Sequence, residues 1–325
     1  MSMLKISLVS FLVAWVIACS SVFAAEPYPE RPVKVVIGFG PGGLNDIVAR
    51  IICNQLTERL GKTFIVENKA GSSGSIGADF VSKAIPDGYT ILLGSVSNVV
   101  IAPAVYPHIP YDPVTGFMPI AMVGGTPNIL VVNPNSKILN LKDLISIAKS
   151  KPGSLAYASA GNGASNHLTG ELFKTMVGID AIHVPYKGDS PALVGLMGGE
   201  TQYMFATIPA AISFINSGKL NAIAVTSPQR SPLTPDVPTV GELGIKNFLV
   251  NVWAGFLAPA GTPQYIVNKL SNEIIEITKL ESVQRQLLAQ GVEPNPVGSA
   301  AFGAIIKSDL ERWRGVAKTA LISPQ

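Results

Sequence analysis

Short runs of apolar, β-branched residues alternate with amphipathic stretches along most of this chain, and that alternation strongly constrains its fold. In the first third, VKVVIGF (33–39), TFIVEN (63–68) and TILLGS (90–95) have the composition of buried strands. Between them, the apolar spacing predicts helices over 45–61 and from 77 to about 84. A β-α-β-α-β order predicts an α/β fold built on a doubly wound parallel sheet.

The rest of the chain continues the alternation and predicts a second unit. Further strands are expected at 122–134, 154–161, 181–188, 201–209, 220–227 and 251–259. Further helices are expected at 141–153, 164–178, 190–199, from about 209 to 218, 262–280 and 300–321. We expect strand 251–259 and the two helices after it to return to the first unit. This predicts two lobes, one of residues 25–125 plus 250–325 and the other of residues 126–249.

The N-terminus has the pattern of a secretory signal peptide over residues 1–24. Lys5 precedes an apolar run over 6–18, which is too short to cross a bilayer core of about 20 residues, and small residues end the segment at Ala24. A second processing route stays open, because residues 16–19 resemble a lipobox that would leave a lipid-anchored Cys19. Cleavage after Ala24 predicts an exported chain in which Cys53 has no disulfide partner.

Composition narrows the function classes. The 325 residues are enough for two domains, and charged residues make up 14% of the chain, well below the roughly 25% of an average soluble protein. The formal net charge of +3 has no run of Lys or Arg behind it, which argues against a nucleic-acid partner. Cys53 lies within an apolar helical pattern and is expected to be a small buried hydrophobe.

Glycine- and serine-rich turns follow several predicted strands and lead into helices. The three segments are FGPGGLND (39–46), GSSGSIG (71–77) and GNGASNH (161–167), and Ser95, Ser97 and Asn98 follow strand 90–95 in a similar way. Glycine lets the backbone approach a ligand closely, and free N–H groups at a helix start attract negative charge. One such turn would be explained by helix capping alone, but three together favour an anion site.

Other chemistries have weaker support. Residues 38–43 satisfy G-x-G-x-x-G and Glu67 ends the next strand, but Pro41 removes one N–H group from that loop, and a lone fingerprint of a dinucleotide enzyme is weak. His108, His167 and His183 show no metal-ligand spacing, so no metal or other cofactor is expected. No G-x-S-x-G elbow is present, and Ser72, Ser73 and Ser75 are better hydrogen-bond donors than nucleophiles.

Long segments of the chain resemble the tripartite tricarboxylate transporter receptor family, also called Bug proteins. The resemblance covers nearly the whole chain after the leader, in the segments YPERPVKVVIGFGPGGLNDIVAR (28–50), VENKAGSSGSIGADFVSKAIPDGYTILLG (66–94), YDPVTGFMPIAMVG (111–124), YASAGNGASNHLTGELFK (157–174), HVPYKGDSPAL (183–193), AVTSPQRSPLTPDVPTVGELG (224–244) and GFLAPAGTPQYIV (255–267).

The resemblance implies a periplasmic solute receptor, not an enzyme. Its two α/β lobes, each a sheet flanked by helices in the manner of a type II periplasmic binding protein, would close by a hinge around a small carboxylate. The implied partners are that carboxylate, which could be a di- or tricarboxylate or an aromatic acid, and the membrane subunits of a tripartite transporter. We expect a monomer. Presentation of the ligand to a membrane sensor kinase is the alternative that stays open.

The resemblance also implies a set of ligand-binding residues. From the first lobe these are Phe39, Pro41, Gly42, Gly43, Asn45 and Asp46, with Ser75 and Ser97 nearby. From the second lobe they are Asn162, Ala164, Ser165, His167, Tyr186 and Lys187. Asp46 cannot itself attract an anion, so we expect it to cap the helix or to orient a water molecule.

Two positions depart from the family pattern. Leu44 replaces a residue that is often small or hydroxylated, and it would narrow the pocket or remove a hydroxyl contact. Ala206 stands where many members have Asp. If an acid at this position reads an ammonium or other polar group, Ala206 disfavours amino-acid ligands.

Overall fold

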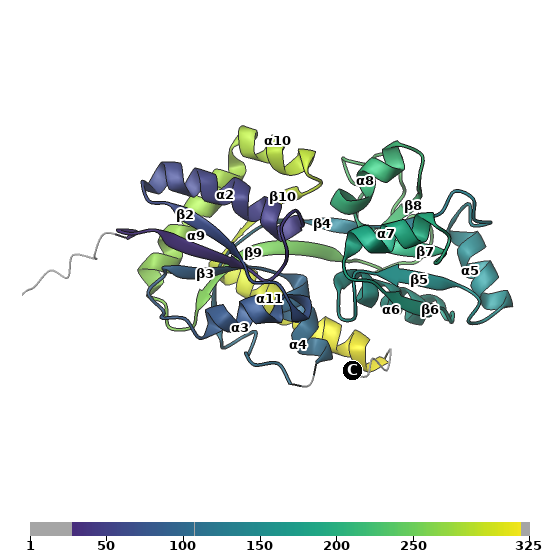
Figure 1. Ribbon diagram of the computed structural model, residues 1–325, viewed down its shortest axis with the longest axis horizontal. Coiled ribbons are helices and arrows are strands. Elements are labelled where there is room, and N and C mark those ends of the chain that lie inside the picture. Colours follow the sequence, from purple (N-terminus) through teal and green to yellow (C-terminus); the bar gives the residue numbers. More distant parts are fainter. Residues whose placement is uncertain (1–27, 107, 320–325) are drawn as a thin grey trace, which may run out of the picture. The chain divides into compact units, whose positions relative to one another are not determined.

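The computed structural model describes residues 28–106 and 108–319, and the chain from residue 31 onward forms one compact unit (Figure 1). The predicted signal peptide, the cleavage position after Ala24 and the alternative anchor at Cys19 lie outside these residues. Within the described ranges, no helix combines the length and apolar character needed to span a membrane.

The described residues form ten strands that pair into one continuous sheet. The strands are β1 (Val33–Ile37), β2 (Phe64–Asn68), β3 (Thr90–Ser95), β4 (Phe117–Val132), β5 (Ala156–Ser159), β6 (Ile182–Pro185), β7 (Tyr203–Thr207), β8 (Asn221–Val225), β9 (Asn251–Pro259) and β10 (Glu293–Gly298). Their order across the sheet is β2-β1-β3-β9-β4-β7-β5-β6, and β8 and β10 both pair with β4.

Helices connect most of these strands. They are α2 (Leu44–Leu60), the short turn η1 (Ser72–Gly74), α3 (Ser75–Ser82), the π-helical turn η2 (Ser97–Ile101), α4 (Ala102–Val105), α5 (Leu141–Ser150), α6 (Ser165–Val177), α7 (Asp189–Met197), α8 (Ile208–Asn216), α9 (Gln264–Lys279), α10 (Glu281–Ala289) and α11 (Ser299–Thr319). Capping residues explain several ends; for example, α2 ends at Gly61, which has the left-handed conformation that glycine tolerates.

Strand β4 connects the two halves of the sheet. Its first part pairs with β9 and β10, and from Asn128 onward it pairs with β7 and β8. The changeover is held by Thr226, whose hydroxyl accepts a hydrogen bond from the Asn128 N–H and donates one to the Val250 carbonyl. β4 and β9 therefore cross together from one half of the sheet to the other (Figure 1).

The sheet differs from the doubly wound parallel sheet predicted from strand order. β1 does pair in parallel with β2 and β3, and β5 with β6 and β7. However, β9 lies antiparallel between β3 and β4, and β4 is antiparallel to all of its neighbours. The sheet is mixed because β4 and β9, which are far apart in sequence, lie side by side at its centre and run antiparallel to their neighbours. The lobe boundaries 25–125 plus 250–325 and 126–249 stay a prediction.

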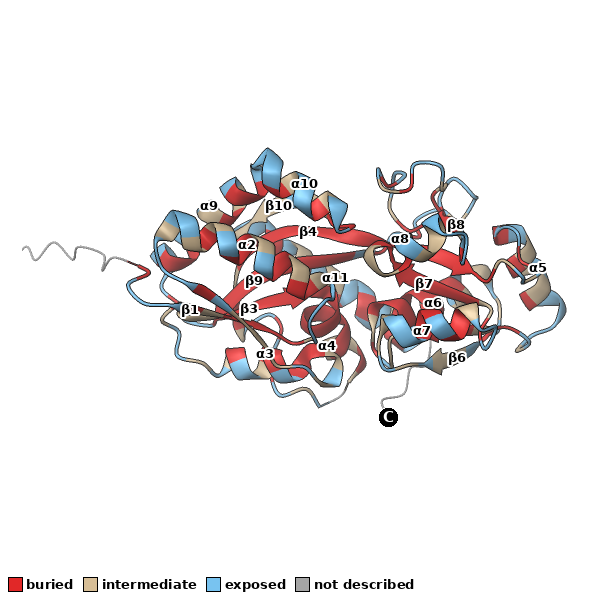
Figure 2. Cartoon of the chain, turned by 45° about the horizontal axis from the view of Figure 1, so that its top comes forward, coloured by how far each residue is buried: buried red, intermediate tan, exposed pale blue. Residues whose placement is uncertain are grey.

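Separate apolar clusters fill the two halves, and buried residues occur in both of them (Figure 2). Trp253, Phe302 and Trp313 are fully buried beside β3 and β9 in one of them. In the other half, Tyr157 and Phe205 belong to a cluster on one face of the sheet, and a second apolar cluster that includes Ala206 covers the other face. Cys53 is buried in α2 and free, as predicted, and burial raises the pKa of its thiol to about 12. Each half therefore has its own core, and the connection between them is largely strand.

Candidate functional site

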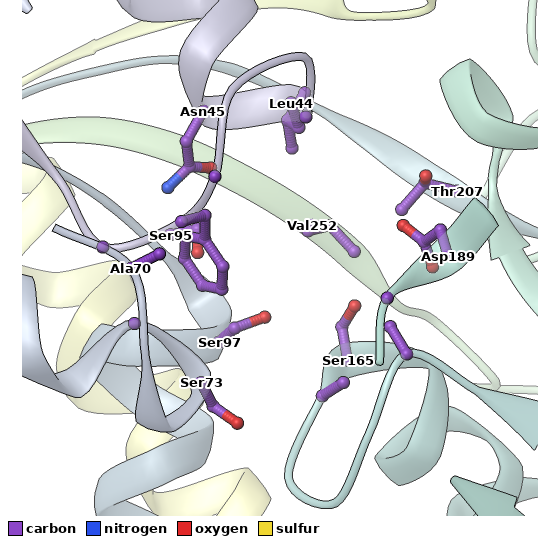
Figure 3. Close-up of a pocket in the computed structure, with 18 of the residues that line it drawn as sticks. Leu44, Asn45, Ala70, Ser73, Ser95, Ser97, Ser165, Asp189, Thr207 and Val252 are labelled. Carbon is purple, nitrogen blue, oxygen red and sulfur yellow. The ribbon is translucent and has the colours of Figure 1, made fainter. Parts of the chain in front are cut away.

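A cavity of about 580 Å³ opens between the two halves of the sheet (Figure 3). Loops after β1, β2 and β3 line one wall, and loops after β5, β6 and β7 line the other. Val252 of the crossing strand β9 lies between the two walls. The loops meet here because the carboxyl ends of parallel strands share one edge of a sheet.

Five helices begin at this cavity. Their N-cap residues all line it and are Gly43 of α2, Gly74 of α3, Ala164 of α6, Gly188 of α7 and Thr207 of α8. None of the five forms a side-chain capping hydrogen bond. The first N–H groups of a helix have no partner within the helix, and the helix dipole gives them partial positive charge. The cavity is therefore surrounded by donors suited to an anion.

Hydroxyl and amide side chains add further polar groups to the lining. Ser73, Ser95, Ser97 and Asn45 lie on the first wall, and Ser165 lies opposite them. Apolar contacts come from Phe39, Leu44 and Val252, as well as from three alanines. The charged side chains on the lining are Lys187, which is exposed, and Asp189. The cavity can thus hold a small molecule with an anionic group and an apolar body.

Close backbone packing shapes the first wall. A β-carbon placed on Gly38 would lie 2.3 Å from the carbonyl oxygen of Gly74, so the loops after β1 and β2 touch through their main chains. Gly74 itself has φ +88°, a conformation that favours glycine, and the ring of Phe39 lies against it. Glycines in these loops were predicted to let the backbone approach a ligand closely. In the structure, Gly38 and Gly74 let the backbones of the two loops approach each other.

Seven of the residues predicted to bind ligand line the cavity. They are Phe39, Gly43, Asn45, Ser97, Ala164, Ser165 and Lys187. The other seven lie outside its lining and are Pro41, Gly42, Asp46, Ser75, Asn162, His167 and Tyr186. Most of these are adjacent to lining residues and support the loops that form the walls.

Asp46 organises the loop before α2. Its carboxylate accepts hydrogen bonds from the Gly42 N–H, from Arg50 and from Asn68. Burial by itself would raise the pKa of Asp46, but these hydrogen bonds together hold it below its ordinary value. The Asp46 side chain thus stays ionised and holds the loop before α2 by these hydrogen bonds. This agrees with the expectation that it does not attract an anion.

Asn162 joins the two walls by its main chain. Its carbonyl oxygen accepts hydrogen bonds from the Ser73 hydroxyl at 3.1 Å and from the Tyr106 hydroxyl at 2.9 Å. The Tyr106 ring also lies against Gly163, whose φ is +74° and where a β-carbon would come within 2.9 Å of the tyrosine oxygen. These contacts bridge loops from opposite sides of the cavity.

The remaining predicted residues have structural contacts. Ser75 accepts a hydrogen bond from the buried Tyr111 hydroxyl, and the Tyr186 hydroxyl donates to Glu200 at 2.7 Å. His167 stacks on His183 with ring centroids 3.9 Å apart, and its Nδ1 accepts a hydrogen bond from the Gly163 N–H. Burial lowers the pKa of His167 to about 4 and that of His183 to about 3. The neutral imidazole of His167 therefore supports the loop that carries Asn162.

Several lining residues were not predicted as ligand contacts. Ser73, Asp189 and Thr207 are examples, and Thr207, which directly follows Ala206, is the N-cap residue of α8. Ala206 itself is fully buried in an apolar cluster outside the cavity lining, so the idea that position 206 selects ligands lacks a contact with the site. Leu44 does line the cavity, as its predicted effect on pocket size requires.

The alternative chemistries gain no structural support. The carboxylate of Glu67 forms ion pairs with Lys34 and Lys69 and is thereby engaged on the surface. The rings of His167 and His183 stack on each other, which their spacing in the sequence did not indicate. Even so, the described residues contain no group of three His, Cys, Asp or Glu side chains that could hold a metal ion.

Comparison with known proteins places this architecture in a family. The family model described as "Tripartite tricarboxylate transporter family receptor" matches residues 48–321. Protein BugT of Bordetella pertussis is 37% identical over 296 residues, which cover 91% of each chain. A UPF0065 protein of the same organism is 34% identical over 313 residues, or 96% of each chain.

Solved structures agree with these sequence matches. R. palustris Rpa4515, in a structure with adipate, superposes with a TM-score of 0.85 at 34% identity and covers 92% of this chain and 100% of its own. MatC from Rhodopseudomonas palustris with bound malate has a TM-score of 0.80 at 31% identity, over 89% and 99% of the two chains. The periplasmic binding protein BugD has a TM-score of 0.81 at 36% identity, over 92% and 100%. The fold is therefore that of the two-lobed solute-binding proteins, and the chain belongs to the tripartite tricarboxylate transporter receptor family.

Proposed function

We propose that this protein is a periplasmic receptor that binds a small carboxylate in the cavity between the lobes. The observation that carries the proposal is the set of five uncapped helix N-termini at one cavity. Their N–H groups need an acceptor, and a carboxylate supplies two oxygens with several lone pairs. The related structures with adipate and with malate support the same class of ligand.

Lobe closure would couple binding to delivery. A ligand shifts a conformational equilibrium only if it binds one form better than the other. Helices α2 and α3 start on one wall, and α6, α7 and α8 start on the other, so a carboxylate can meet both groups together only when the walls approach. The crossing strands β4 and β9 are the natural hinge. The closed, liganded form would then be recognised by the membrane subunits of a tripartite transporter, with no turnover of the ligand.

A thermal-shift screen tests this proposal. The chain from Ala25 onward would be unfolded, refolded to remove any co-purified ligand, and heated with a panel of carboxylates, their neutral amides and NAD. A ligand at about 100 times its dissociation constant adds about 2.7 kcal/mol to the stability, which raises the melting temperature by a few degrees. We expect a shift with at least one carboxylate, none with NAD, and unchanged ligand recovered afterwards. Shifts with NAD alone, or recovery of a converted product, would contradict the proposal.

A further inference from the structure

A carboxylate side chain lies on the wall of a cavity that is otherwise built for anions. Asp189 is the first residue of α7, and Figure 3 shows its carboxyl group directed into the cavity near Thr207. The ring of helix N-termini can tolerate this charge, since negative side chains are favourable in the first turn of a helix. A second negative charge brought beside it by a ligand would be repelled.

Asp189 accepts a hydrogen bond from the side chain of Asn166. The Asn166 side-chain oxygen accepts from the N–H groups of Ala160 and His167, so its orientation is determined by two backbone donors. Its Nδ2 must therefore face the other way, where it donates to Asp189 Oδ1 at 2.7 Å. Asn166 is only 2% exposed, so this arrangement is part of the folded wall.

Asp189 is not neutralised by a cation. In the part of the chain that the structure describes, Asp189 forms no ion pair, and Lys187, which lines the same cavity, is exposed. Burial raises the pKa of Asp189 to about 6, against the lowering effect of the hydrogen bond from Asn166. At neutral pH the carboxylate is thus mainly ionised, with Oδ1 engaged by Asn166 and the group open to the cavity.

We propose that Asp189 is a specificity-determining residue that selects a monocarboxylic acid with a hydroxyl or ammonium group remote from its carboxylate. This inference rests on the proposed function, because the ligand carboxylate is held by the helix N-termini. The donor at the far end of the ligand then pairs with Asp189. A linear dicarboxylate of the same length places a second anion there and binds more weakly.

Matched ligands and two variants test the inference. The probes are 6-hydroxyhexanoate, 6-aminohexanoate, hexanoate and adipate, which share one chain length and differ at the far end. Their dissociation constants would be measured by titration calorimetry at pH 7.5 for the wild-type protein, Asp189→Asn and the control Asp236→Asn. Asp236 is exposed in a loop away from the cavity, so its substitution makes the same charge change elsewhere.

For the wild-type protein and the control, we expect 6-hydroxyhexanoate or 6-aminohexanoate to bind at least about tenfold more tightly than adipate. In Asp189→Asn, the affinity for adipate should rise at least about tenfold relative to the affinity for the hydroxy acid, because the introduced amide can donate a hydrogen bond to the second carboxylate of adipate. Equal binding of adipate and the hydroxy acid by the wild-type protein would overturn the inference even if the variant fails to fold. So would an unchanged ratio in a folded variant. Absence of binding by every acid, in contrast, would count against the proposed function itself.

Discussion

The Ser73 hydroxyl donates a hydrogen bond of 3.1 Å to the main-chain oxygen of Asn162, although 89 residues separate the two in sequence. Ser73 lies in η1, after β2, and Asn162 lies between β5 and α6. The same oxygen accepts the Tyr106 hydroxyl. One carbonyl group thus ties the two walls of the cavity together, at a place that would separate if the lobes opened.

Removal of both donors should weaken ligand binding. In a Ser73→Ala, Tyr106→Phe double variant, each lost hydrogen bond should cost about 0.5–1.5 kcal/mol of closed-state stability, and affinity should fall by about tenfold. Titration calorimetry of the bound carboxylate measures this, with Tyr265→Phe on the exposed face of α9 as the control. Unchanged affinity in the double variant would show that the Asn162 contacts do not stabilise the liganded form.

The loop before α2 should depend on the Asp46 carboxylate. Asp46→Asn removes the charge that pairs with Arg50, and we expect a loss of about 1–3 kcal/mol in the free energy of unfolding. Because the folded-state pKa lies below the ordinary 3.8, this stabilisation is present above that pH and is lost as the pH falls through the folded value. Urea unfolding at pH 7 measures the difference.

Asp87→Asn, which breaks an exposed pair with Arg31, is the control for that measurement and should change stability by less than about 1 kcal/mol. If Asp46→Asn were no more harmful than Asp87→Asn, the carboxylate would have no special role in holding the loop.

The stacked histidines should make the protein acid-sensitive. Their folded pKa values of about 4 and about 3 lie below the unfolded value near 6.5, so the unfolded chain binds protons first as the pH falls. Stability should therefore drop between about pH 6.5 and 4, by about 2 kcal/mol for each histidine at pH 5. Unfolding titrations at pH 7.5 and 5 should show a smaller drop in His183→Gln than in the wild type. The exposed His108→Gln provides the control; an identical drop in all three proteins would contradict this account.

Leu44 should contribute to the affinity for ligands with an apolar body. Truncation in Leu44→Ala removes three carbon atoms from the cavity wall. Each ligand methylene that is buried against those atoms contributes about 0.8 kcal/mol to the binding free energy, and this contribution is lost. We expect weaker binding of six-carbon acids by about threefold or more, with little change for acetate. Leu139→Ala, at a position 72% exposed and outside the cavity, should leave both affinities unchanged. Equal losses for long and short acids would contradict an apolar contact at Leu44.

Much of the architecture could be predicted from residue patterns. Strands such as β1 and β3 are short apolar runs between glycine-rich turns, and α2 has clear apolar spacing with Gly61 at its end. The antiparallel placement of β9 between β3 and β4 could not be predicted, because pairing between distant strands leaves no local signal. Helix α10 and strand β10 were also missed; the sequence EPNPVG of β10 contains two prolines, which argue against a strand.

The site was predicted by its loops more than by its side chains. Phe39, Asn45, Ser97 and Ser165 follow strand ends, and the structure brings them to one cavity. Asp189 also follows a strand and a glycine, but a single acid in a turn is usually a helix cap, so no local pattern indicates that it belongs to an anion site. Its hydrogen bond from Asn166 is a contact across 23 residues, which no local pattern could indicate.

The most direct test of the central claim compares a carboxylate with its neutral isostere. Titration calorimetry of 6-hydroxyhexanoate and 6-hydroxyhexanamide into the refolded chain from Ala25 onward isolates the charge that the helix N-termini should hold. We predict that the acid binds at least about 100-fold more tightly than the amide, since charge-assisted hydrogen bonds are roughly twice as strong as neutral ones and several act together. Equal affinity for the two compounds would show that the five helix N-termini at the cavity do not form a carboxylate site.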